Sequence, residues 1–165
     1  MLLDSIRRLS LLVLLCLMQA LVLNRIRIDH CIMPLLYVYF VIIFPRNYPK
    51  WALLLWSFLM GMSIDAFLNT PGLASASMTL AAVLQPYLIE LFLPRDAEEN
   101  IKASAKALGW GNFVALASVL VVIYCVVFFT LESFSFFNWL NWLESIGGSV
   151  VLTLVLVFTF ESVRK

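Results

Sequence analysis

The stretch that decides the fold is residues 51–93, WALLLWSFLMGMSIDAFLNTPGLASASMTLAAVLQPYLIELFL. It contains two apolar runs, Trp51–Leu68 and Leu73–Leu93, each close to the ~20 residues that an α-helix needs to cross a bilayer. The residues between them, NTPG from Asn69 to Gly72, have the composition of a tight turn. A short turn between two apolar helices predicts an antiparallel helical hairpin in a membrane.

The composition of the whole chain extends this prediction to all 165 residues. Hydrophobic residues make up 63% and charged residues 13%, whereas soluble domains average about 45–50% and about 25%. The sequence therefore predicts an all-α polytopic membrane protein, in which residues 1–165 form one domain of six transmembrane helices. The predicted spans are residues 9–24, 28–44, 51–68, 73–93, 113–131 and 143–160.

The bounds of the first and last spans are open to alternatives. The first could also be the apolar region of a signal peptide that ends at Ala20, but Leu21–Leu23 continue the apolar run, which favours an uncleaved helix. The last apolar run, Ile146–Phe160, is shorter than a span requires. We therefore expect its helix to begin near Leu140 or to end beyond Phe160.

Lysine and arginine are distributed unevenly between the two sides that six spans would create. The amino-terminal segment, the 45–50 loop, the 94–112 loop and the carboxyl-terminal tail carry nine of them, and the opposite side carries only Arg25 and Arg27. Short loops rich in Lys and Arg stay in the cytoplasm. The sequence therefore predicts a multi-pass protein of the inner (cytoplasmic) membrane with both termini in the cytoplasm.

Asp65 is the first charged residue after the uncharged run Trp51–Ile64. An ionised carboxylate at the centre of a bilayer costs about 2.5–3.5 kcal/mol on insertion scales, so acids inside spans are functional candidates. Two interpretations of Asp65 stay open. It is either an interfacial acid bonded to the turn at Asn69–Thr70, or an inward-facing group that bonds a partner helix or lines a cavity.

Small and polar residues lie on one face of each helix of the hairpin. Ser57, Gly61 and Asp65 follow one another at every fourth position, and Ser77 and Gln85 share a face of the second helix. Small residues let helix backbones approach each other in lipid. We expect the two faces to meet each other or a shared neighbour. The predicted packing or partner-contact residues are Ser57, Gly61, Asp65, Ser77 and Gln85.

Four other residues are expected to shape the hairpin. Pro71 and Gly72 suit its turn. Pro86 lies inside the second helix, where a proline removes a backbone hydrogen bond and kinks the helix. We expect Gln85 or a neighbour to bond the freed carbonyl, and Tyr87 to shape the same part of the helix.

The residues offer little for catalysis or metal binding. His30, the single histidine, lies between Asp29 and Cys31, and a lone histidine in such a run is better interpreted as structural or exposed. The serines lack a paired base, and the chain has no glycine-rich phosphate loop followed by Lys-Ser or Lys-Thr. Cys16, Cys31 and Cys125 are expected to be reduced, packed thiols. We therefore predict no enzymatic activity, no cofactor, no metal and no nucleic-acid partner.

Residues 44–96, FPRNYPKWALLLWSFLMGMSIDAFLNTPGLASASMTLAAVLQPYLIELFLPRD, resemble the central region of the MreD family of rod shape-determining membrane proteins. The shared pattern is an apolar helix with Gly61 and then Asp65, a turn with Pro-Gly-Leu at 71–73, and a second helix with an aromatic residue, Tyr87. The later run FFTLESFSF, at residues 128–136, and the Gln-Pro-Tyr before it resemble the branch of the family found in Bacteroidetes.

This resemblance implies a non-enzymatic subunit of the rod complex, or elongasome, which organises peptidoglycan synthesis and cell shape. It implies contact with an MreC-like protein and with membrane lipid. Through MreC the subunit would act with MreB, RodA and a class B penicillin-binding protein. The family fold resembles the six-helix substrate-binding subunits of energy-coupling-factor (ECF) transporters.

Two other functions remain as alternatives. A substrate-capturing subunit of a vitamin or small-molecule transporter would need a polar pocket open to the periplasm. A lipid-handling enzyme would need polar residues clustered at one depth of the membrane, and the sequence contains no such cluster.

Overall fold

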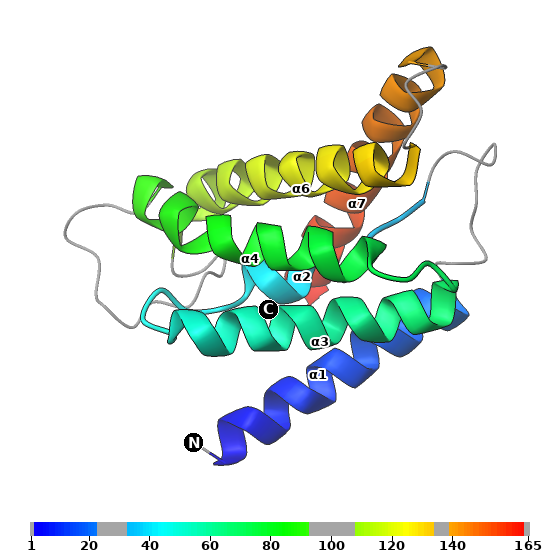
Figure 1. Cartoon of the computed structure of the whole chain (residues 1–165). Helices are drawn as coiled ribbons and strands as arrows, with labels where there is room; N and C mark the ends of the chain where they lie inside the picture. The colour runs from blue at the N-terminus through cyan, green and yellow to red at the C-terminus, as the bar shows by residue number, and fades with distance from the viewer. Residues whose placement is uncertain (1, 23–32, 93–107, 134–138, 164–165) are drawn as a thin grey trace.

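The computed structural model describes residues 2–22, 33–92, 108–133 and 139–163. Within these ranges every regular element is a helix (Figure 1). The helices are, in chain order, α1 (Leu2–Leu21), α2 (Val38–Ile42), α3 (Lys50–Leu68), α4 (Leu73–Phe92), α6 (Trp110–Ser133) and α7 (Trp139–Val163). The prediction of an all-α polytopic membrane protein is confirmed.

Four of the described helices, α3, α4, α6 and α7, are long and apolar enough to cross a membrane. Both α6 and α7 extend beyond the predicted spans 113–131 and 143–160 at both ends. α1 begins with a charged segment that contains Asp4, Arg7 and Arg8, so only its later part is a continuous apolar run. Six spans for the whole chain stay a prediction, because residues 23–32 lie outside the described ranges.

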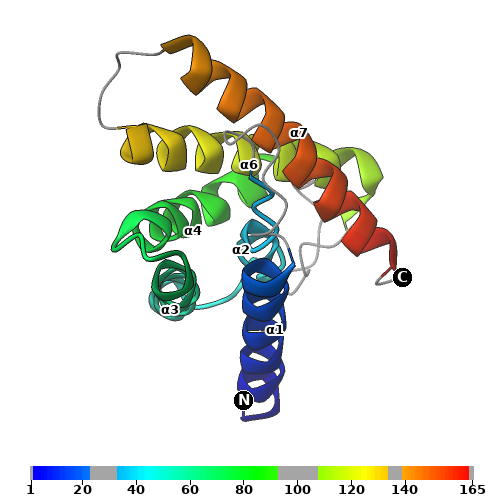
Figure 2. The same cartoon turned by 90° about the vertical axis from the view of Figure 1, so that its right-hand side faces the viewer.

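The long helices form a curved layer around the short helix α2. α3 packs against α1 and α4, α4 packs against α6, and α6 packs against α7. Seen along the layer, α1, α3, α4, α6 and α7 follow one another around α2 (Figure 2). Because α2 itself contacts α1, α3, α4 and α6, it lies at the centre of the molecule.

The segment around α2 differs from the continuous helix predicted over 28–44. Its described part begins with the non-helical residues 33–35, and α2 is only five residues long. Residues 35–42 are each at most 3% exposed, so the protein itself must satisfy their backbone. Pro34 supplies no N–H, and its carbonyl accepts a hydrogen bond from the Gln19 amide of α1 at 2.7 Å.

Two side chains of α7 bond the same non-helical backbone. The N–H of Met33 donates to Ser149 Oγ at 3.1 Å, and the N–H of Leu35 donates to Thr153 Oγ1 at 3.1 Å. Non-helical backbone at membrane depth is tolerated only where protein groups surround and bond it. The hydroxyls of α7 and the amide of α1 therefore explain why a continuous helix is not needed here.

Candidate functional site

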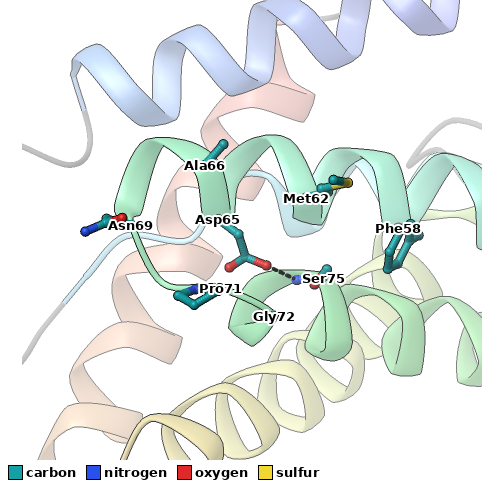
Figure 3. Close-up of a pocket in the computed structure, with 8 residues that line it drawn as sticks. All are labelled: Phe58, Met62, Asp65, Ala66, Asn69, Pro71, Gly72 and Ser75. Carbon is teal, nitrogen blue, oxygen red and sulfur yellow. Dashed lines mark hydrogen bonds between the residues drawn. The ribbon is translucent and has the colours of Figure 1, made fainter.

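Asp65 lies in the last turn of α3, and its carboxylate bonds the first turn of α4 (Figure 3). Oδ1 accepts a hydrogen bond from the N–H of Ala74 at 2.8 Å, and Oδ2 accepts one from the N–H of Ser75 at 3.0 Å. The hydroxyl of Thr70 donates to Oδ1 at 3.3 Å. The first N–H groups of a helix lack partners within it and form the positive end of its dipole. The Asp65 carboxylate therefore caps α4 from the preceding helix.

Each of the two interpretations of Asp65 made from the sequence agrees with part of this geometry. The side chain bonds the turn through Thr70, and it also faces inward, at 6% exposure, to bond a neighbouring helix. The neighbouring helix is α4 of the same chain, and both carboxylate oxygens accept hydrogen bonds from it. A contact of Asp65 with another protein stays a prediction.

Gly61 lies one turn before Asp65, at a point where α3 packs closely against α4. A Cβ placed on Gly61 would lie 2.4 Å from Cα of Ser75 and 2.8 Å from the carbonyl oxygen of Ala74. Both neighbours are backbone atoms, which cannot rotate away as a side chain can. Only glycine therefore allows the separation between α3 and α4 at which the Asp65 carboxylate reaches the N–H groups of α4.

The turn between the two helices uses two left-handed backbone conformations. Asn69 ends α3 with φ 56° and ψ 35°, and its N–H donates to the carbonyl of Asp65. Gly72 has φ 89°, a value that favours glycine. Pro71 and Gly72 are both exposed, so these residues set the path of the chain and leave the turn accessible.

An open pocket of about 560 Å³ lies on the outer side of this hairpin. Most of its lining is apolar, and its polar lining residues are Asp65, Asn69 and Ser75 (Figure 3). Its lining residues are Phe58, Met62, Asp65, Ala66, Asn69, Pro71, Gly72 and Ser75. Phe58, Met62 and Ala66 form the face of α3 that borders the pocket, because they are four residues apart.

The remaining predicted packing residues are buried, but they do not all meet across the hairpin. Ser57 is fully buried, and its hydroxyl has no hydrogen-bond partner within the described ranges. Ser77 donates to the carbonyl of Leu73 in its own helix at 2.8 Å. Gln85 donates through Nε2 to the carbonyl of Phe44 at 3.1 Å. The face of α4 that includes Gln85 is therefore directed toward the segment around α2, whereas Gly61 and Asp65 of α3 meet the start of α4.

Pro86 and Tyr87 lie in the second half of α4. The helix continues past Pro86 to Phe92. Of the two alternatives for the carbonyl freed by Pro86, the structure does not show a bond from Gln85, whose amide nitrogen donates to the carbonyl of Phe44, and a bond from a neighbour stays a prediction. Tyr87 is 60% exposed, and the Lys50 ammonium lies 5.1 Å from the centre of its ring.

Sequence reasoning missed the polar face of α7. Its buried residues include Ser145, Ser149, Thr153, Val157 and Glu161, which recur at every fourth position. Such a spacing places all five on one face of the helix. The pattern is visible in the sequence, and it could have indicated that this face bonds polar groups of the core.

Two pairs of polar side chains also join the segment around α2 to the long helices. The hydroxyl of Tyr37 shares a hydrogen bond with that of Tyr124 on α6, and the ring centres are 5.6 Å apart. The hydroxyl of Tyr39 donates to the carboxylate of Glu161 on α7. No short sequence motif marks these pairs, because their members are far apart in the chain.

The described residues contain no group of three or more His, Cys, Asp or Glu side chains that could hold a metal ion. His30 and Cys31, considered in the sequence analysis, lie outside the described ranges. Cys16 and Cys125 are free, buried thiols. Comparisons of the chain with protein-family models, with curated proteins and with solved structures find no match.

Proposed function

We propose that this protein is a non-enzymatic subunit of the elongasome in the inner membrane. In this role it contacts an MreC-like protein and thereby helps to position RodA and a class B penicillin-binding protein relative to MreB. The proposal rests on the resemblance of residues 44–96 to the MreD family. It includes the predicted orientation, with both termini in the cytoplasm.

The observation that carries the proposal is that the residues of the pattern shared with the MreD family together fix the geometry of the α3–α4 hairpin. Gly61 permits the close approach of α3 and α4, and Asp65 caps α4 with both carboxylate oxygens. Gly72 gives the turn its left-handed conformation. These residues fix the shape of one hairpin, and both carboxylate oxygens of Asp65 bond its backbone, which supports a structural and binding role.

The face that such a rigid hairpin would offer to a partner is the α3 side of the pocket. Phe58 and Met62 are 46% and 57% exposed, and the small residue Ala66 lies one turn further along. In lipid, helices associate through close packing, because the hydrophobic effect does not drive them together. A bulky side chain of the MreC-like partner that enters this pocket would give the required complementary fit.

Co-purification of the MreC-like partner from native membranes tests the proposal. Ala66→Trp fills the pocket, and we expect it to remove most of the partner while leaving insertion and expression unchanged. Val122→Trp is the matched control, since Val122 is a 42% exposed residue of α6 that does not line the pocket. Retention of the partner by Ala66→Trp, or equal loss in both variants, would rule out this contact.

A second candidate function, the substrate-capturing subunit of a transporter, is favoured by the same pocket. Its volume, about 560 Å³, lies within the range of about 300–1,000 Å³ typical of small-molecule sites. This function predicts that a small molecule co-purifies with the protein and is lost from Ala66→Trp. Mass spectrometry of the denatured, purified protein distinguishes the two functions, because the elongasome subunit would release only lipid.

A further inference from the structure

The guanidinium of Arg8 on α1 lies against two adjacent aromatic rings of the loop that precedes α3. The centre of its guanidinium lies 4.7 Å from the centre of the Phe44 ring and 3.8 Å from that of Tyr48. Phe44 is 4% exposed and packs against Tyr48, with ring centres 5.1 Å apart. The two rings therefore fix the position of the cation, and they attract it through their negatively charged faces.

Within the described part of the chain, the same guanidinium lacks the polar partners that such a group requires. Its Nη1 atom is buried and has no hydrogen-bond partner among the side chains that the structure describes, which do not include that of Asp4. Aromatic rings accept no conventional hydrogen bond from the five N–H groups of an arginine. Part of the Arg8 side chain remains accessible from the surface, although Nη1 itself is buried.

The position of Arg8 in the chain places this cation at the boundary of the membrane. The residues that follow it, Leu9–Leu21, form the apolar part of α1. The loop that carries Phe44 and Tyr48 also contains the exposed residue Arg46, and the exposed Lys50 follows it as the first residue of α3. Aromatic residues combined with Arg and Lys are characteristic of the headgroup level of a bilayer.

The lipid-facing side of α1 begins at Leu9, one residue after Arg8, whereas Arg8 itself shares the buried face of the helix with Leu12. Leu9, Val13 and Leu17 are exposed and lie four residues apart, so they form one stripe along the helix. Acyl chains could follow this stripe while the phosphate of the same lipid meets Arg8. A soluble phosphate ester would have no use for such an apolar surface, so the geometry favours a lipid.

We propose that Arg8, positioned against the rings of Phe44 and Tyr48, binds the phosphate of an anionic phospholipid. The planar guanidinium suits a phosphodiester, because it can donate two parallel hydrogen bonds to two phosphate oxygens. Arg46 in the same loop and Lys50 at the start of α3 add positive charge, which favours an anionic headgroup over a zwitterionic one. This site is independent of the pocket on the α3–α4 hairpin and of the elongasome role.

Native mass spectrometry of the full-length protein, delipidated in detergent, measures this binding directly. The probes are phosphatidylglycerol, phosphatidylcholine and inorganic phosphate, added separately at equal concentration. We expect phosphatidylglycerol to be retained preferentially. Arg8→Gln should weaken its retention about tenfold, because it loses a charge-assisted contact. Arg7→Gln is the matched control, since Arg7 is an exposed neighbour whose loss changes the net charge equally.

A second variant separates a built site from general attraction between charges. Tyr48→Leu keeps every charge but removes the ring 3.8 Å from the guanidinium centre, so it should also weaken retention of phosphatidylglycerol. It also covers the case in which Arg8→Gln does not fold. Equal effects of Arg7→Gln and Arg8→Gln, or no effect of Tyr48→Leu, would overturn the proposal. Equal binding of phosphatidylcholine, or of inorganic phosphate in an Arg8-dependent manner, would overturn the assignment of an anionic lipid.

Discussion

At the scale of single residues, Asp65 joins α3 to α4 through two hydrogen bonds, from Ala74 and Ser75, and accepts a third from Thr70 in the turn. Asp65→Ala removes the cap of α4 and leaves the N–H groups of Ala74 and Ser75 without the carboxylate. Loss of a helix cap destabilises a protein by about 0.5–2 kcal/mol, and we expect a value at the upper end because the site is buried. Thermal unfolding of the purified protein in detergent checks this.

Asp65→Asn provides a graded comparison for the same site. Asparagine keeps one carbonyl oxygen as an acceptor but cannot accept a hydrogen bond from both Ala74 and Ser75 at once. Its melting temperature should therefore lie between those of the parent protein and Asp65→Ala. If Asp65→Ala has the same melting temperature as the parent protein, the carboxylate is not a cap that stabilises the hairpin.

The close packing at Gly61 predicts the effect of a larger side chain at this position. Gly61→Ala brings a Cβ within 2.4 Å of Cα of Ser75, so α3 and α4 must separate. Overpacking of this kind costs about 1–3 kcal/mol, and the separation would also lengthen the hydrogen bonds of Asp65. Gly147→Ala on α7 is the control, because its added Cβ meets no atom within 4 Å. A lower melting temperature is expected for Gly61→Ala alone, and equal melting of both variants would contradict the tight contact.

At the scale of elements, α7 holds the non-helical residues around Pro34 through side chains. Thr153→Val keeps the shape of the side chain but leaves the buried N–H of Leu35 without its acceptor. An unsatisfied buried donor costs about 1–3 kcal/mol. Thr159→Val is the control, since Thr159 is exposed and donates only to the carbonyl of Val155 in its own helix. Thermal unfolding should show a clear loss for Thr153→Val and little change for the control.

The elements also show which parts of the fold sequence patterns can predict. Hydropathy located α3 and α4 almost to the residue, because a long apolar run bounded by Pro49 and by NTPG leaves few other conformations. It could not predict the short α2, because a buried apolar run has the same composition whether it is helical or not. The bonds that permit the non-helical backbone come from Ser149 and Thr153, more than one hundred residues away.

For the candidate site, too, sequence patterns predict some features and not others. The spacing of Gly61 and Asp65 placed both on one buried face, as four-residue periodicity requires. The identity of their contact depends on where the turn directs α4, which Asn69 and Gly72 determine through positive φ values. Sequence periodicity therefore indicates which residues face inward, whereas turn geometry decides which atoms they meet.

At the scale of the whole molecule, the path of the buried segment around α2 bears on which side of the membrane the segments rich in Lys and Arg lie. Figure 1 places the start of α1 and the start of α3 at the same end, with the α3–α4 turn at the opposite end. The segment before α3 must therefore return through the centre of the helical layer, although α2 is only five residues long. A crossing without a long helix is possible because the surrounding helices bury and bond its backbone.

This path predicts where each part of the chain lies relative to the membrane. Nine of the eleven Lys and Arg residues fall on the side of the two termini in the six-span arrangement. Retention of positive loops on the inner side then requires both termini in the cytoplasm and the turn at Asn69–Gly72 in the periplasm. Alkaline phosphatase should be inactive when fused after Lys165 and active when inserted after Gly72. Activity of the Lys165 fusion would mean an odd number of crossings, and the buried segment around α2 would then not cross the membrane.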